Sequence, residues 1–405
     1  MMGQAGDRRK MHVAHRESRA RLILFLSLTI CALAWTGALT IRQVTQTFSP
    51  SIAAKISPSN APANDGLAEF LLAQNGFKAD PDDLMAYAKR SIQSQGLNGP
   101  ALRNAGLSMV IAHRPDAARR YFLLAEKTGR RDAMVDLALF EDAIRRGNIA
   151  RGLALLDRAL RVNENVQEVV FPALTKVLAN REVANQIAPT LARADWTGDY
   201  AAFATSHSAA TPVLGQVVTD HPEVAAGLDP ARQRTLVRKL VQMGRAGLAV
   251  STYESLTGQR TATTQVAEPF IIKDGWPPID WEIATGGQIT IGPAAEGGIS
   301  FTITRGGEHV IARRLLRLAP GPYRILAKTP EPPKSLQDVG LRIDLKCANT
   351  STELTALKLG DGSPDAADKS FSVPEGCPLQ WAEVRGRAGR EMKSGALAAL
   401  KITER

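Results

Sequence analysis

The feature that constrains this chain most is a run of twenty residues without a charged side chain, from Leu22 to Ile41. An α-helix rises about 1.5 Å per residue, so about 20 residues cross the ~30 Å hydrocarbon core of a bilayer. Arg21 and Arg42 bound the run, and Cys31 lies within it. The sequence therefore predicts a single transmembrane helix over 22–41.

Charge before this segment predicts its direction. Residues 1–21 contain six Lys or Arg and two Asp or Glu, and positive charge tends to stay in the cytoplasm. We therefore expect a basic cytoplasmic tail, an inner (plasma) membrane anchor of bacterial type, and periplasmic C-terminal domains. The alternative is a cleaved signal peptide, for which Ala32, Leu33 and Ala34 form a small-residue cleavage pattern. Either way, the remainder of the chain is exported.

The excess of basic over acidic residues in the chain does not indicate nucleic-acid binding. The 405 residues have a formal net charge of +10, of which the tail supplies +4. No lysine-rich run or interleaved aromatic stripe follows the tail, and such features typify nucleic-acid interfaces. We expect no nucleic-acid partner.

Two regions with different patterns follow the anchor. Residues 42–65 are rich in Ser, Pro, Ala and Asn and lack helical periodicity, which predicts a flexible linker. From 66 to 260, apolar residues recur at helical spacing between turns that contain Gly or Pro. This pattern predicts an all-α domain.

A repeat of 34 residues occurs within the helical region. The matching positions are Ala118, Phe122 and Ala125 in one unit and Gly152, Leu156 and Ala159 in the next, with His113 and Gly147 each five residues before, and Gly106 at a small position of the preceding helix. This spacing resembles that of tetratricopeptide repeats, which are paired helices stacked into a curved array. Two units cover about 99–163, and the flanking helices are divergent repeats or other helices.

The resemblance implies that the helical region binds a protein partner. These repeat residues pack helix against helix and do not identify a ligand. A helical spacer without a ligand is the alternative interpretation.

The pattern changes near residue 268. Short alternating runs separated by Gly and Pro continue to 405, which predicts an antiparallel β-sandwich. Three stretches, 278–281, 318–323 and 376–381, resemble the jelly-roll sandwiches of carbohydrate-binding modules over about 275–404. The resemblance implies that the sandwich binds an envelope polysaccharide.

Sugar-binding sandwiches stack sugar rings on exposed aromatic side chains. Trp276 lies in a predicted loop, and we name it with Tyr323 as a possible glycan platform. Trp281 and Trp381 are expected to pack in the core.

Cys347 and Cys377 are the only cysteines outside the apolar segment. In an oxidising periplasm two such thiols tend to pair, so the sequence predicts a disulfide. Two buried free thiols are the alternative.

No catalytic constellation is evident in the sequence. It contains no Gly-rich phosphate loop, no HExxH and no GxSxG, and its six histidines do not cluster. We expect no catalytic, cofactor-binding or metal-ligating residues and a non-enzymatic scaffold or adaptor. The alternative is an accessory or hydrolytic enzyme of envelope polysaccharide metabolism whose catalytic residues cannot be read from the sequence.

Overall fold

The computed structural model describes residues 58–129, 131–162, 165–261, 265–269, 275–284, 286–294, 298–304, 306–329, 340–359 and 366–405, together with positions 49, 51–52 and 55. It divides into two compact units, residues 1–163 and 164–405. The basic tail, the predicted transmembrane helix over 22–41 and half of the predicted linker lie outside the described residues. None of the described helices is long and apolar enough to span a bilayer.

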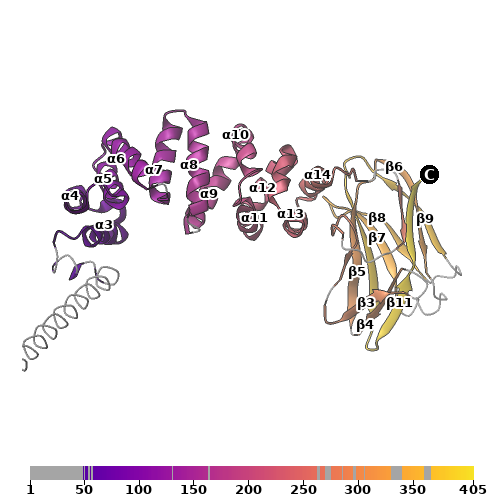
Figure 1. Cartoon of the computed structure of the whole chain (residues 1–405). Helices are drawn as coiled ribbons and strands as arrows, with labels where there is room; N and C mark the ends of the chain where they lie inside the picture. Colours follow the sequence, from indigo (N-terminus) through magenta and orange to yellow (C-terminus); the bar gives the residue numbers. More distant parts are fainter. Residues whose placement is uncertain are drawn as a thin grey trace, which may run out of the picture. The chain divides into compact units, whose positions relative to one another are not determined.

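The described part of the first unit contains six α-helices and one 3-10 helix, and Figure 1 labels the α-helices as α3 to α8. They are α3 (Ala61–Asn75), η1 (Gly76–Lys78), α4 (Pro81–Gln95), α5 (Gly99–Ile111), α6 (Pro115–Thr128), α7 (Ala133–Arg145) and α8 (Ile149–Val162). Because α3 begins at Ala61, the predicted linker over 42–65 is five residues too long at its end. Side chains cap several of these helices: Asn60, Asp80, Asn98 and Asp132 accept hydrogen bonds from backbone N–H groups of the first turn.

The repeat extends further toward the N-terminus than the sequence indicated. Helices α4, α6 and α8 begin at Pro81, Pro115 and Ile149, each 34 residues after the last. The described helices of the first unit therefore form three hairpins, α3–α4, α5–α6 and α7–α8. The first hairpin is a divergent repeat, because Leu84, Ala88 and Ser91 occupy the positions held by small, aromatic and small residues in the second.

The predicted packing positions of the repeat are buried except Gly147, which is exposed because it lies in the turn between α7 and α8 and not on a packed helix face. Ala118, Phe122 and Ala125 lie in the core of the second hairpin, and Gly152, Leu156 and Ala159 lie buried in α8. Gly106 of α5 is in direct contact with the ring of Phe122, because a Cβ atom at Gly106 would lie 2.6 Å from it.

The second unit contains further helices and the C-terminal strands. The helices are α9 (Asn165–Leu178), α10 (Arg181–Leu191), α11 (Thr197–Ser206), α12 (Thr211–Asp220), η2 (Pro222–Gly227), α13 (Pro230–Gln242) and α14 (Ala246–Thr257). Phe171 of α9 packs edge-on against Tyr200 of α11, with ring centroids 5.4 Å apart. The fully buried hydroxyl of Tyr200 shares a hydrogen bond with Thr175, so this aromatic contact joins α9 and α11.

Twelve strands are present in the described part of the C-terminal region. They are β1 (Gln265–Pro269), β2 (Glu282–Ile283), β3 (Ile289–Pro293), β4 (Ile299–Ile303), β5 (Gly307–Leu316), β6 (Gly321–Lys328), β7 (Arg342–Cys347), β8 (Glu353–Lys358), β9 (Ala366–Val373), β10 (Gln380–Ala388), β11 (Lys393–Leu397) and β12 (Ala399–Glu404). Each pairing is antiparallel. The predicted start at residue 268 is three residues late, since β1 begins at Gln265.

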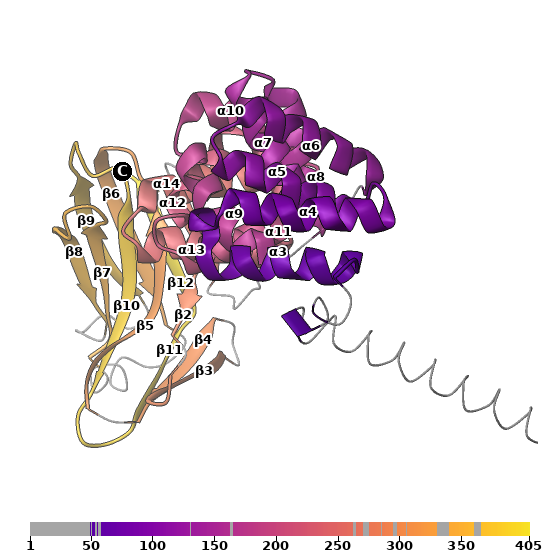
Figure 2. The same cartoon turned by 90° about the vertical axis from the view of Figure 1, so that its left-hand side faces the viewer.

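These strands form an antiparallel β-sandwich (Figure 2). One sheet has the order β1-β12-β6-β9 and another the order β2-β5-β10-β7-β8, while β11, β4 and β3 form a small third sheet. Their inward-facing residues form one apolar core, which includes Ile325, Ile343 and Val384. The prediction of an all-β C-terminal sandwich is confirmed.

The predicted disulfide is present. Cys347 ends β7 and Cys377 lies in the turn before β10, with Cα atoms 5.5 Å apart. Both residues are buried in the core of the sandwich.

Candidate functional site

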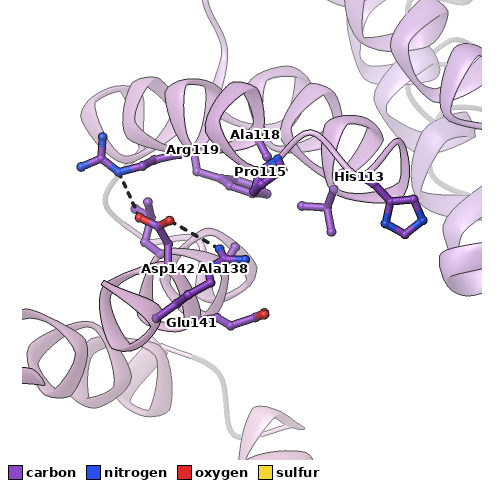
Figure 3. A pocket seen from close by; sticks show the side chains of 11 residues that line it. His113, Pro115, Ala118, Arg119, Ala138, Glu141 and Asp142 are labelled. Atoms are coloured by element: carbon purple, nitrogen blue, oxygen red, sulfur yellow. Dashed lines mark hydrogen bonds and ion pairs between the residues drawn. The ribbon is translucent and has the colours of Figure 1, made fainter. Parts of the chain in front are cut away.

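A pocket of about 380 Å³ lies in the first unit, where the turn between α5 and α6 faces α7 (Figure 3). Its apolar lining comes from three helices and consists of Val110, Ala118, Phe122, Ala138 and Leu139. Its polar lining consists of His113, Arg119, Glu141, Asp142 and Arg145. The pocket thus combines an apolar floor with charged side chains, as expected of a ligand-binding cleft.

His113 lies in the turn that leads into α6, and its backbone is left-handed, with φ of 55°. The residue 34 positions later, at the end of α7, is Gly147, whose φ is 74°. Glycine adopts this conformation freely, whereas an L side chain there costs about 1–2 kcal/mol. Figure 3 places the His113 imidazole at one end of the pocket and Arg119 at the other. The chain therefore keeps a strained histidine where the next repeat has a glycine, and strain of this kind often marks a functional position.

At the other end of the pocket, Asp142 of α7 contacts three arginine side chains. Its carboxylate, only 10% exposed, accepts hydrogen bonds from Nε of Arg119 at 3.0 Å and Nε of Arg146 at 3.0 Å, and Arg145 lies 3.4 Å away. Hydrogen bonds to Asp142 and Asp116 raise the pKa of the Arg146 guanidinium. Three guanidinium groups thus share the Asp142 carboxylate, and Arg146 has Asp116 as a second acidic partner at 2.7 Å.

Two polar side chains of the pocket are uncommitted. Within the described part of the chain, neither the His113 imidazole nor the Glu141 carboxylate makes a hydrogen bond or ion pair. The structure leaves both groups available to a ligand in the pocket.

The surrounding repeats are strongly basic. Residues 99–162 contain twelve Lys or Arg and seven Asp or Glu, a net charge of +5. The chain after residue 21 has a net charge of +6, so this short region holds most of it. Such a concentration attracts acidic ligands.

The structure does not support a pair of catalytic carboxylates here. A glycosidase needs one protonated carboxylic acid and one free carboxylate. Glu141 and Asp142 are the two acids of the pocket, but the Asp142 oxygens are already engaged by Arg119, Arg145 and Arg146, which leaves Glu141 as the one acid without an ion pair there. Elsewhere among the described residues, no group of three His, Cys, Asp or Glu is placed to hold a metal ion.

The proposed glycan platform needs correction. Tyr323 is 1% exposed and stacks on Phe371 in the core of the sandwich, so its ring cannot receive a sugar. Trp276 is half-buried, and its ring packs edge-on against Tyr253 of α14, with centroids 5.5 Å apart. Alternation along β6 directs Tyr323 inward, and this direction depends on a register that the sequence motif did not reveal.

Trp381 does not pack in the core, in contrast to the expectation from the sequence. Its neighbours Ala382 and Val384 point into the core, whereas Trp381 lies on the outer face of the five-stranded sheet, with Arg313 5.2 Å above its ring. Trp281 does pack against the core, as predicted.

The structure defines the architecture of this protein: helical hairpins with a 34-residue period, followed along the chain by further helices and an antiparallel β-sandwich. No family model and no curated protein sequence matches the chain.

Solved structures show limited similarity. The tetratricopeptide-repeat protein YrrB, described as having an unusual peptide-binding site, is 15% identical over 51% of this chain and 90% of its own, with a TM-score of 0.28. PilF of Pseudomonas aeruginosa is 17% identical over 55% and 88%, with a TM-score of 0.27. The C-terminal CBM6 of LamC from Zobellia galactanivorans is 16% identical over 29% and 90%, with a TM-score of 0.19.

Proposed function

We propose that this protein is a non-enzymatic scaffold of the cell envelope. In this proposal the helix over 22–41 anchors it in the inner membrane, the helical repeats bind a protein partner, and the β-sandwich binds an envelope polysaccharide. The observation that carries the proposal is the pocket between α5, α6 and α7. There, a strained His113 and an unpaired Glu141 lie beside an apolar floor.

The pocket best fits an extended segment of a partner protein that carries acidic and apolar side chains. The apolar floor around Phe122 accepts a side chain from the segment, and burying it there is favourable by about 25 cal/mol per Å². Arg119 and Arg145, which share Asp142 with Arg146, have guanidinium N–H groups to offer to an acidic residue of the segment.

Site-specific crosslinking of the full chain in intact cells tests this binding. A photoreactive residue replaces His113 or Glu141, and Lys127, an exposed residue of α6, serves as the control position. We expect positions 113 and 141 to capture the same protein, through an acidic segment identified by mass spectrometry, and position 127 to capture none of it. Equal capture from all three positions would contradict the proposed pocket.

The topology is tested separately. Alkaline phosphatase folds only where disulfides form, so its fusion after residue 65 should be active and its fusion after residue 10 inactive. N-terminal sequencing of the membrane-extracted protein tests the anchor, because a first residue after Ala34 would show a cleaved signal peptide instead.

A further inference from the structure

The outer face of strand β7 carries charged side chains, one of which is fully buried. Ile343, Leu345 and Cys347 point into the core, so Arg342, Asp344 and Lys346 project from the opposite face. The Asp344 side chain is nevertheless fully buried among its charged neighbours.

Three cations lie side by side across this face. In the strand register, Arg342 of β7 is directly opposite Arg385 of β10 on one side and Lys358 of β8 on the other. We call Arg385, Arg342 and Lys358 the cationic row. Like charges directly opposite one another destabilise a sheet, so this row needs acidic partners or an anionic ligand to offset the repulsion.

Three acidic residues neutralise part of the row, and one of them, Glu383 of β10, lies 2.6 Å from Arg385. Glu308 of β5 lies 2.9 Å from Arg342, and the Asp344 carboxylate lies 3.1 Å from Arg342 and 3.3 Å from Arg385. Burial raises the pKa of Asp344, and the three surrounding cations act against that shift. Arg342 and Arg385 therefore have acidic partners within the sheet.

Lys358 of β8 and the nearby Arg387 of β10 have no acidic partner among the described residues. Within the residues that the structure describes, neither side chain makes an ion pair or hydrogen bond. Both line a pocket of about 720 Å³ together with Arg342 and Glu308. The buried Nε of Arg342 also lacks a hydrogen-bond acceptor. The pocket thus has three cations, one acid and an unused donor.

We propose that this pocket and the cationic row bind the carboxylate groups of an acidic polysaccharide, a polyuronate. The proposal rests on the proposed polysaccharide-binding role of the sandwich and identifies its site and the chemistry of its ligand. Guanidinium groups bind carboxylates through paired hydrogen bonds. Cations on neighbouring strands repeat at about 4.8 Å, which suits a polymer that carries one anion per unit.

The lining favours a saccharide over a protein partner. Leu341 and Leu359, the aliphatic residues of the pocket, are 1% and 4% exposed, so they offer almost no apolar contact area. Protein interfaces need a desolvated apolar centre, whereas a polyuronate presents hydroxyl and carboxylate groups throughout.

Binding of alginate oligosaccharides to the detergent-purified full chain tests the proposal, by isothermal titration calorimetry. Dextran oligosaccharides serve as the neutral probe and polyphosphate as the non-saccharide anion. The variant is Lys358→Ala with Arg387→Ala. The matched control is Lys328→Ala with Lys401→Ala, which removes two exposed lysines from β6 and β12 of the four-stranded sheet.

We expect wild type and the control to bind alginate and the K358A/R387A variant to bind it at least about tenfold more weakly, since charged hydrogen bonds are lost. The variant's Tm should not fall, because the removed cations have no partners. Unchanged alginate affinity in K358A/R387A would overturn the site, and polyphosphate binding as tight as alginate binding would overturn the saccharide class.

Two further results separate this inference from the proposed function. If dextran binds wild type and K358A/R387A equally while alginate does not bind, the inference fails but the polysaccharide-binding role survives. If no polysaccharide binds wild type, both fail for the sandwich, and the crosslinking test of the helical pocket still decides the protein-binding role.

Discussion

Asp65 shows how a single buried group can set a pH dependence. It lies in α3, is 8% exposed, and burial raises its pKa from 3.8 to about 6. The nearby Glu69 also raises the pKa, while a hydrogen bond with Ser91 and the charge of Arg103 lower it. The folded protein thus binds this proton more tightly than the unfolded chain does. The stabilisation from Asp65 is present below about pH 4 and is lost as the pH rises to about 6.

Asp65→Asn should therefore stabilise the first unit near neutral pH. The amide is never charged, so the cost of a buried carboxylate, roughly 2 kcal/mol at pH 7.5, disappears. Amide hydrogen exchange in α3 and α4 of the full chain measures the effect. At pH 4 the variant should exchange like wild type. An advantage of equal size at both pH values would contradict the assigned cause.

His113→Gly tests whether the strained residue serves binding. Glycine accepts a φ of 55° without strain, so the variant should be as stable as wild type or up to about 1 kcal/mol more stable. Crosslinking of the partner through position 141 should fall. Ser351→Gly, at the other non-glycine residue described with a positive φ, is the control and should leave crosslinking unchanged. A normal crosslink in His113→Gly would remove His113 from the site.

At the scale of elements, glycine at the helix contact sets the distance between α5 and α6. Gly106→Ala should destabilise the first unit by about 1–3 kcal/mol, because its Cβ would overlap the buried Phe122 ring. Gly247→Ala in α14 is the control, since nothing lies within 4 Å of its added Cβ, and the better helix former should stabilise by up to about 1 kcal/mol. Thermal unfolding followed by circular dichroism compares them. Stabilisation by both substitutions would refute the close contact.

Element type was well predicted from the sequence, but repeat number was not. The 3.6-residue and two-residue periods of apolar residues are local properties, so the change from helices to strands near residue 268 could be read directly. The sequence left open whether the first hairpin is a divergent repeat, because Leu84, Ala88 and Ser91 occupy the repeat positions with different side chains. Packing requires complementary volume and not a fixed residue type.

At the scale of the whole molecule, the disulfide closes a loop between β7 and β10. The chain-entropy model gives about 3–4 kcal/mol for a separation of 30 residues. The double variant Cys347→Ser/Cys377→Ser should therefore lower the unfolding temperature of the sandwich and leave protection of α3–α8 from hydrogen exchange unchanged. Thiol labelling of the denatured, unreduced protein checks the bridge itself: only Cys31 should react, and labelling at two further sites would disprove it.

The candidate sites, unlike the element types, depend on contacts between distant parts of the chain. The cationic row depends on the register of β10, β7 and β8, which brings Arg385, Arg342 and Lys358 together from distant parts of the chain. A shift of one residue would send those side chains to the opposite face. Sequence spacing alone carries no signal for this register.

The sequence by itself determined the apolar segment over 22–41, the 34-residue period, the change to short strands and the pairing of Cys347 with Cys377. These properties follow from local periodicity and from the chemistry of single residue types. Only the tertiary structure decided that Tyr323 is buried, that Trp381 faces outward, and that His113 and Glu141 line one pocket. Those properties arise from strand register and from helices packed across the 34-residue repeat, which bring together residues that no local pattern connects.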